Sequence, residues 1–281
     1  MSPAQPPDES IQKPTPPPNS GPVVVFNNIS IQFEEKHVLK NISFTVERGE
    51  TLIILGPAGC GKSVLLKLAN GLLKPDSGTI EIFGQCINSM SERDVYALRA
   101  HIGMVFQESA LFDSLSVEEN VAYRLNEERL PEDQVHAKVV EALKFVELSQ
   151  AIDKFPSELS GGMRRRVSIA RAIISAPDLI LYDSPTGGLD PITSTTIIEL
   201  VVKQRDVSHT TSLLVTHRLQ DGFTLATYRY NQQAGKMEPL PNGELEDSTR
   251  FLLLNEGSIV YHGDTSGLIS SNDPWIREFL S

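Results

Sequence analysis

The chain has 281 residues and 40% of them are hydrophobic, enough to form the core of one large α/β domain or of two small ones. Its formal net charge is −11, from 36 acidic and 25 basic residues, which argues against a nucleic-acid-binding protein because such proteins usually carry a basic excess. No apolar run approaches the ~20 residues that cross a bilayer, and no signal peptide is recognisable at the start, so we expect a protein made in the cytosol that is soluble or peripheral to a membrane.

The first 22 residues are rich in Pro, Ser, Gln and Asn. Such a composition buries too little apolar area to offset the entropy lost on folding, so residues 1–22 are predicted to be a disordered tail. Order is expected from the apolar run 23–26 onward. The stretches 29–33 and 38–46 alternate apolar and polar residues, which predicts antiparallel strands with a turn at 34–36 between them.

The most informative stretch is an apolar run at 51–55, a glycine-rich turn, and a segment with helical spacing at 64–70. Strand, turn and helix in this order are the context in which a Gly-x4-Gly-Lys-Ser pattern binds phosphate. Glycines let backbone N–H groups curl around an anion, and the helix start adds unpaired donors and a positive dipole end. Lys62 brings a charge to the β- and γ-phosphates, and the Ser63 hydroxyl can ligate Mg²⁺. The residues predicted to surround the phosphates are Gly56, Pro57, Ala58, Gly59, Cys60, Gly61, Lys62, Ser63 and Val64.

Strands and helices alternate through the middle of the chain. The predicted strands are 79–84, 102–106, 179–183 and 212–216. The predicted helices are a short one that starts at Ser91, a helical stretch over 116–150, one over 164–174, and one that opens at Pro191 with Asp190 as its N-cap. This alternation predicts a largely parallel sheet with right-handed crossovers, flanked by the early antiparallel strands and carrying an inserted helical block at about 116–175.

The C-terminal part departs from this alternation. Residues 228–249 carry two glycines and two prolines among scattered charges, and are predicted to form a loop or a hairpin. Strands are expected again at 250–254 and 258–261, followed by short helices up to the end of the chain. The two cysteines have no metal or redox spacing, and Cys60 is expected to be a free thiol inside the phosphate-binding turn.

The glycine-rich turn is followed, in order, by Gln107 after a strand, a Leu-Ser-Gly-Gly-Met turn at 159–163, Asp183 at a strand end, a Gly-Gly-Leu-Asp turn at 187–190, and His217 after a strand. These six motifs in this order make the chain resemble the ATP-binding-cassette (ABC) family over nearly everything after the tail. The resemblance implies an α/β P-loop NTPase fold with a RecA-like mainly parallel sheet, an antiparallel β subdomain and an inserted α-helical subdomain. The ATP-binding domain would occupy 23–264, and 265–281 would form a C-terminal helical end. The implied cofactors are ATP and Mg²⁺.

The resemblance also implies roles for single residues. Asp183, at the end of a strand, is similar to the Walker B aspartate that holds Mg²⁺, and Gln107 to the Q-loop glutamine that senses Mg²⁺ and the attacking water. His217 resembles the switch histidine that contacts the γ-phosphate. The implied metal-site residues are Ser63, Gln107 and Asp183, and the implied catalytic residues are Gln107, Asp183, Ser184 and His217.

Three further positions resemble nucleotide-binding elements of the family. The turn at 159–163 is similar to the signature motif, with Met163 where Gln is usual, and its open N–H groups suit the γ-phosphate held by another subunit. Asp190 resembles the D-loop aspartate, although it can also be simply a helix cap. Phe33 lies 23 residues before Gly56, where the family places a ring under adenine; otherwise it is a core aromatic. The residues implied to bind nucleotide here are Phe33, Ser160, Gly161, Gly162 and Asp190.

One position departs from the family pattern. The residue after the Walker B aspartate is normally a glutamate that polarises the attacking water, but here it is Ser184. A serine cannot act as a carboxylate base, and positioned acid–base groups contribute ~10²–10⁴ in rate. The sequence therefore predicts slow hydrolysis, or that His217 or Gln107 takes over the role. An ATP-gated clamp with little hydrolysis is an alternative function.

The stretch 107–122 and the ending 271–280 resemble the ATPases of Mla-type phospholipid transporters, which work with MCE-domain proteins at the bacterial cell envelope. This resemblance implies a head-to-tail pair of identical chains, a separate integral membrane permease, possibly an MCE-domain partner, and a peripheral position at the cytoplasmic face of the inner membrane. Another ABC importer or exporter remains an alternative. Cassette proteins that act on DNA or ribosomes commonly carry two cassettes or coiled-coil arms, which this chain lacks.

Overall fold

The computed structural model describes residues 21–281, so the disordered tail predicted for 1–22 lies, except for its last two residues, outside the described part. A six-stranded sheet in the order β12-β11-β3-β8-β7-β6 forms the centre of the fold, and all its neighbouring strands are parallel except the edge strand β12. Its strands are β3 (Thr51–Leu55), β6 (Ile102–Val105), β7 (Leu179–Asp183), β8 (Thr211–Val215), β11 (Thr249–Asn255) and β12 (Ser258–Asp264). The predicted, mainly parallel sheet is thus confirmed: β3 and β7 have their predicted ranges, the ends of β6, β8 and β11 differ by one residue, and β12 ends three residues later than predicted.

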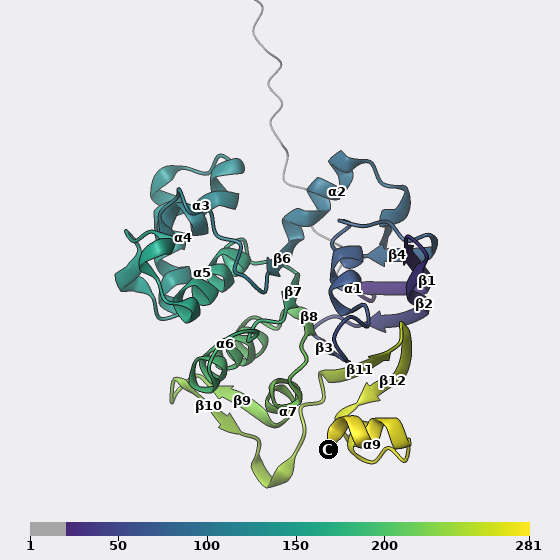
Figure 1. Cartoon of the computed structure of the whole chain (residues 1–281). Coiled ribbons are helices and arrows are strands. Elements are labelled where there is room, and N and C mark those ends of the chain that lie inside the picture. The colour runs from purple at the N-terminus through teal and green to yellow at the C-terminus, as the bar shows by residue number, and fades with distance from the viewer. Residues whose placement is uncertain (1–20) are drawn as a thin grey trace, which may run out of the picture.

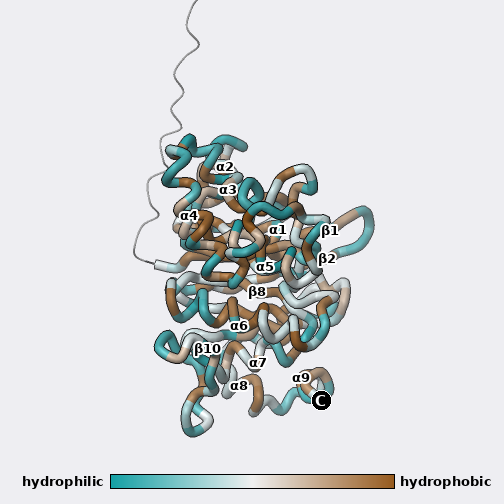
Figure 2. The backbone as a smooth tube through the Cα atoms, turned by 90° about the vertical axis from the view of Figure 1, so that its left-hand side faces the viewer, coloured by the Kyte–Doolittle hydropathy of each residue, from teal (hydrophilic) through white to brown (hydrophobic). Residues whose placement is uncertain are grey.

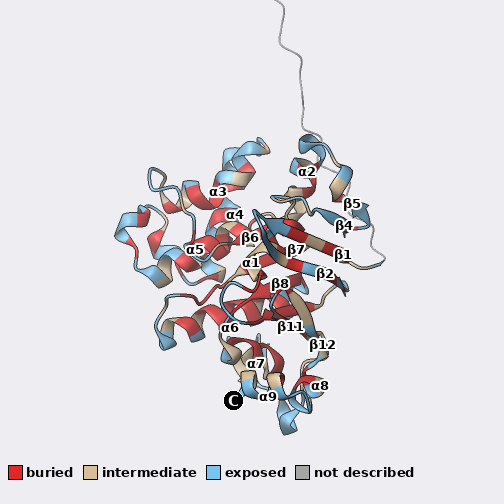
Figure 3. Ribbon diagram, turned by 45° about the vertical axis from the view of Figure 1, so that its right-hand side comes forward, coloured by how far each residue is buried: buried red, intermediate tan, exposed pale blue. Residues whose placement is uncertain are grey.

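The central sheet is buried on both faces. All five residues of β3 are buried, with Ile53 and Leu55 in one hydrophobic core and Leu52 and Ile54 in the other, because successive side chains of a strand point to opposite faces. Figure 3 shows β7 and β8 largely buried in the same way. In Figure 2 hydrophobic segments gather around β8 and α6 (Pro191–Ser208), and hydrophilic ones lie more often at the periphery. This two-sided burial explains why these strands read as continuous apolar runs in the sequence.

A second sheet is antiparallel, in the order β2-β1-β4-β5, and lies to the right in Figure 1. Its strands are β1 (Val24–Phe33), β2 (Lys36–Val46), β4 (Ser77–Ile82) and β5 (Gln85–Cys86). The strand predicted at 29–33 is the second half of β1, which is continuous from Val24 and has a register irregularity after Phe26, where Asn28 has a φ of 51°. This bulge breaks the apolar–polar alternation, so the alternating pattern marked only the part of the strand that follows it.

Nine helices occur among residues 21–281, and several short 3-10 turns join them. The helices are α1 (Lys62–Ala69), α2 (Glu92–Leu98), α3 (Val117–Glu127), α4 (Glu132–Phe145), α5 (Gly161–Ile173), α6, α7 (Leu219–Thr227), α8 (Thr265–Ile269) and α9 (Pro274–Leu280). Helices α3, α4 and α5 form a lobe at the upper left of Figure 1, between β6 and β7 in the chain. None of the helices in the described part has the length and apolar character needed to cross a membrane.

The segment 228–249 forms a hairpin that packs on α6, as Figure 1 shows at the lower left. Its strands are β9 (Tyr228–Asn231) and β10 (Lys236–Pro239). The Tyr230 backbone N–H donates to Asp206 of α6 at 2.6 Å, and the Met237 N–H donates to Glu199 at 2.8 Å. Two acidic side chains of one helix therefore anchor both strands, which accounts for scattered polar residues in a segment that is nevertheless ordered.

Asn120 on α3 holds the loop that leads from β6 into the helical lobe. The side chain is fully buried, its Nδ2 group donates to three backbone carbonyls at 3.0 Å, and its Oδ1 accepts from the Phe112 N–H at 2.8 Å. We expect Asn120→Ala to lower the free energy of unfolding by about 1–3 kcal/mol, because it leaves buried backbone groups unpaired. Urea unfolding of the variant measures this. Asn126→Ala, at an exposed position of the same helix, is the control and should change stability by less than about 0.5 kcal/mol; an equal loss in both would contradict the assignment.

Candidate nucleotide-binding site

The turn between β3 and α1 has a backbone that requires glycine. Gly56 has a φ of 152° and Gly61 a φ of 105°. A Cβ on Gly56 would lie 2.3 Å from the Leu254 carbonyl oxygen, and one on Gly61 would lie 2.6 Å from Leu39 Cδ2. Gly61 is the N-cap of α1, so the helix begins at Lys62, two residues earlier than the sequence predicted, and its free N–H groups face the turn.

The Lys62 ammonium group lies over this turn. Its Nζ donates to the carbonyl oxygens of Gly56 and Pro57, both at 2.8 Å. The turn also forms one wall of a cavity of about 290 Å³, to which segments far apart in the chain contribute. The residues that line the cavity are Val38, Ala58, Gly59, Gly61, Lys62, Ser63, Val64, Gln107, Ser184, Val215 and His217. A charged, glycine-rich wall at the start of a helix is an anion-binding arrangement.

Oxygen atoms suited to Mg²⁺ meet beside this cavity. Ser63 Oγ donates to Asp183 Oδ1 at 3.0 Å, and Gln107 is part of the cavity wall. Hydroxyl, carboxylate and amide oxygens are ligands that Mg²⁺ accepts, and Mg²⁺ usually takes few protein ligands and keeps water or phosphate oxygens. No group of three or more His, Cys, Asp or Glu side chains among residues 21–281 is arranged to hold a metal.

Ser184 lies on the same wall, next to Asp183 in the chain. It is 8% exposed, has a φ of 46°, and its N–H donates to the Val215 carbonyl at 2.9 Å. Gln107 and His217 line the same cavity. The predicted catalytic positions are therefore close in space because they follow the carboxyl ends of neighbouring parallel strands. The cavity offers a hydroxyl at position 184 and no carboxylate there.

A buried network that the sequence did not reveal fixes the loops on either side of the cavity. Asp221 is 3% exposed and accepts hydrogen bonds from the hydroxyls of Thr186, at 2.5 Å, and Thr216, at 2.9 Å. Thr216 directly precedes His217, and Thr186 follows Ser184 by two residues. The carboxylate therefore positions both loops at once. Asp221 was the available signal, because it is the one acidic residue of α7 and lies four residues after His217.

The signature-like turn lies outside the cavity. Ser160 is exposed and caps α5 by accepting from the Met163 N–H at 3.2 Å. A Cβ on Gly162 would lie 2.4 Å from Thr193 Cγ2, and the Thr193 hydroxyl donates to Asp190 at 2.6 Å. That hydrogen bond lowers the pKa of Asp190. Within one chain, the exposed residues Ser160, Gly161 and Asp190 and the half-buried Gly162 therefore form a neighbouring surface that does not line the cavity.

Four predicted nucleotide contacts also stay outside the cavity wall: Phe33, Gly56, Pro57 and Cys60. Phe33 is 43% exposed at the end of β1, so its ring is not a core aromatic. Cys60 is 7% exposed, and burial raises the pKa of its thiol, with the neighbouring Lys62 charge opposing that shift. Val38, which the sequence did not indicate, lies on the wall because the start of β2 packs against Gly61.

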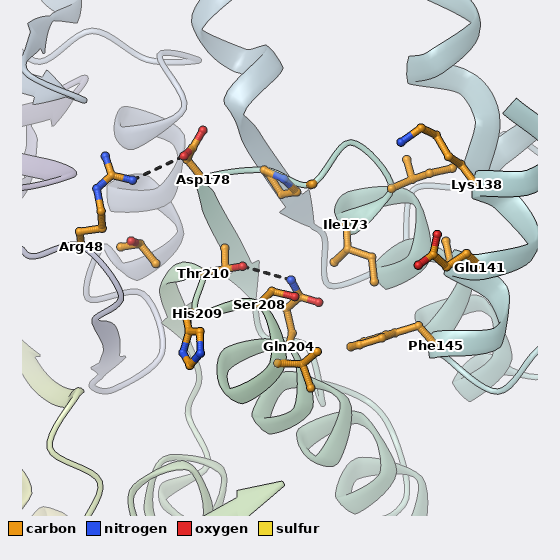
Figure 4. A pocket seen from close by; sticks show the side chains of 16 residues that line it. Arg48, Lys138, Glu141, Phe145, Ile173, Asp178, Gln204, Ser208, His209 and Thr210 are labelled. Atoms are coloured by element: carbon orange, nitrogen blue, oxygen red, sulfur yellow. Dashed lines mark hydrogen bonds and ion pairs between the residues drawn. The ribbon is translucent and has the colours of Figure 1, made fainter. Parts of the chain in front are cut away.

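A larger cavity of about 540 Å³ lies elsewhere, between the helical lobe and the amino-terminal ends of β7 and β8 (Figure 4). Four of its polar side chains pair with one another: Arg48 with Asp178 at 3.5 Å, and Gln204, which donates to the Thr210 hydroxyl at 3.1 Å. Phe145 and Ile173 make part of its wall apolar. It lacks the glycine-rich turn and helix start that suit a triphosphate, so the smaller cavity is the candidate nucleotide site.

The comparison with known proteins agrees with this geometry. The sequence profile of the ABC transporter family matches residues 39–187, more than half of the chain, and the chain therefore belongs to the ABC transporter family. The fold is that of ABC ATPases. The ATP-binding cassette MJ0796, in a dimeric post-hydrolysis state bound to ADP and Pi, is 28% identical with a TM-score of 0.72, covering 86% of this chain and 98% of that one.

Among its relatives, the chain is similar to the intermembrane phospholipid transport system ATP-binding protein MlaF of Escherichia coli K12, with 35% identity over 92% of this chain and 88% of MlaF. It is similar to protein TRIGALACTOSYLDIACYLGLYCEROL 3 of Arabidopsis thaliana, with 36% identity over 94% of this chain and 74% of that protein. The methionine import protein MetN 1 of Bacillus thuringiensis is 40% identical over 70% of this chain and 59% of MetN 1. The chain is thus an ATP-binding subunit of an ABC transporter.

Proposed function

We propose that this chain is the ATP-hydrolysing subunit of a phospholipid transporter of the Mla type. The observation that carries the substrate class is the extent of the match: the phospholipid transport protein aligns over 259 residues, against 201 for the methionine import protein. The methionine import match has the higher identity but leaves 30% of the chain unmatched, since it covers 70%. A different importer is therefore the alternative.

We infer that two copies act head to tail, each contributing Lys62 and its cavity to one nucleotide and its signature turn to the other. Three observations support this pairing. The signature turn is exposed and lies outside the cavity of its own chain. Its open N–H groups at the start of α5 suit a phosphate. The matched MJ0796 cassette is dimeric.

In this proposal, Lys62 and the N–H groups of the turn hold the β- and γ-phosphates, and Phe33 stacks under adenine. Ser63, Gln107 and Asp183 hold Mg²⁺, which neutralises phosphate charge when it is bound. Closure of the pair depends on ATP because the γ-phosphate completes the interface.

The hydroxyl of Ser184 is a poor base, so hydrolysis is slow unless Gln107 or His217 orients the attacking water. If hydrolysis is negligible, the pair is an ATP-gated clamp.

We further propose that an integral membrane permease carries the lipid and holds this subunit at the cytoplasmic face of the inner membrane, with an MCE-domain protein in the same assembly. The test is to purify the tagged chain from detergent-solubilised membranes of its own cells and to identify its partners and bound lipids by mass spectrometry. Recovery of a permease with an MCE-domain protein and phospholipid is the expected result. Recovery of a permease with a methionine-binding protein would contradict the proposal and support a methionine importer instead.

A further inference from the structure

Arg165 on α5 joins two loops that carry cavity residues. It is 4% exposed, and its Nη1 donates to the carbonyl oxygens of Ser184, at 3.0 Å, and Pro185, at 2.8 Å. Its Nη2 donates to the carbonyl of Gln107 and, at 3.4 Å, to that of Gly187. One guanidinium group therefore holds the backbone of the loop after β6 and of the loop after β7.

The chemistry of this contact requires arginine. Within residues 21–281 the group forms no ion pair, so carbonyl oxygens take the place of a carboxylate partner. Burial lowers the pKa of Arg165, and the nearby negative charge of Asp183 opposes that shift. The planar guanidinium fork reaches acceptors on two sides at once, whereas a lysine ammonium is a compact point charge that cannot span them. An Arg165→Lys exchange therefore keeps the charge and loses the bridge.

The start of α5 contacts the same segment of chain as Arg165. The ideal Cβ position of Gly161 lies 3.7 Å from Leu189 Cδ2, and that of Gly162 meets Thr193, at the start of α6. The two cavity loops lie close together, since a Cβ built on Gly187 would be 3.4 Å from Gln107 Cγ. Helix α5 thus lies against Leu189 and Thr193 at its first turn and holds both cavity loops through Arg165 at its second.

We propose that Arg165 is a positioning residue that links the nucleotide cavity to the signature turn of the same chain. It keeps the backbone of Gln107 and Ser184 at a fixed position relative to α5. A nucleotide bound in the cavity therefore also fixes the position of residues 160–162, the surface that meets the second copy. This inference rests on the proposed head-to-tail pair. Arg165 itself does not line the cavity.

The test compares Arg165→Lys with Arg166→Lys in the full-length chain. Arg166 is the neighbouring residue on the same helix and also donates to two carbonyls, of Val146 and Glu147 at 3.3 Å, but these belong to the end of α4. Calorimetry measures the affinity of each variant for MgATP, and sedimentation velocity measures ATP-dependent dimer formation. We expect Arg165→Lys to bind MgATP within about twofold of wild type and to dimerise about 10- to 100-fold more weakly. Arg166→Lys should match wild type in both.

Four outcomes would overturn the inference. If Arg165→Lys dimerises as strongly as the wild type, the Arg165 bridge does not link the nucleotide cavity to the dimer surface. A parallel loss of MgATP affinity and melting temperature would show that the residue only supports folding. If Arg165→Lys does not fold, the Gly187→Ala variant takes its place in the test. The new Cβ would lie 3.1 Å from the Ser184 carbonyl oxygen and would displace the bridged loops while Arg165 remains. Normal dimerisation of Gly187→Ala would contradict the proposal. If the wild type does not dimerise with MgATP, the proposed pair itself fails, and the role of Arg165 falls with it.

Discussion

Replacing Ser184 by glutamate is expected to raise the rate of MgATP hydrolysis by about 10²–10⁴-fold, because it restores a carboxylate base at the cavity wall. Ser184 lines the cavity, so a longer side chain has space to extend into it, and the φ of 46° is already adopted by a non-glycine residue. The positive charge of the nearby Arg165 favours the ionised form of an introduced carboxylate. Phosphate release by the purified chain at saturating MgATP measures the effect.

Ser184→Gln is the matched control for this experiment. It has the size of glutamate but no basic oxygen, so its turnover should stay near that of the wild type. If Ser184→Glu is no faster than Ser184→Gln, the missing carboxylate does not limit the rate. The base would then be sought at His217, which lines the same cavity.

Lys62→Ala is expected to weaken MgATP binding by about 100-fold, because it removes the ammonium group that pairs with the phosphates. The fold should not depend on this side chain, whose Nζ contacts only the turn in front of it. Isothermal titration calorimetry with MgATP measures the change. Lys67→Ala is the control, since Lys67 is exposed on the same helix and lies outside the cavity wall. Equal affinities in the two variants would contradict the assigned phosphate site.

Much of the fold followed from local pattern. Strands 51–55, 179–183 and 212–216 were predictable because a parallel sheet covered on both faces produces short continuous apolar runs. The bulge at Asn28 could not be predicted, because a positive φ at an asparagine does not appear in the hydrophobic pattern. The packing of 228–249 on α6 could not be predicted either, because it depends on Glu199 and Asp206, which are distant in the sequence.

The cavity could be predicted only in part. Gln107, Ser184 and His217 follow buried strands, and the carboxyl ends of parallel strands meet at one edge of a sheet, so their proximity follows from sequence. Val38 could not be found in this way because it enters through contact between β2 and Gly61. Arg165 gave no signal either, since its partners are backbone carbonyls of residues 19 to 58 positions away. The roles proposed for Phe33 and the signature turn need a nucleotide and a second copy, so the contacts within one chain could not show them.

The central claim is that the turn at 56–63 binds the triphosphate of ATP between two copies of this chain. A crystal structure of the full chain with MgATP tests it most directly. The account predicts the β- and γ-phosphates within hydrogen-bonding distance of Lys62 Nζ and of the N–H groups at the start of α1, with the signature turn of a second copy on the γ-phosphate. Electron density for the triphosphate in the larger cavity, or anywhere away from this turn, would contradict it.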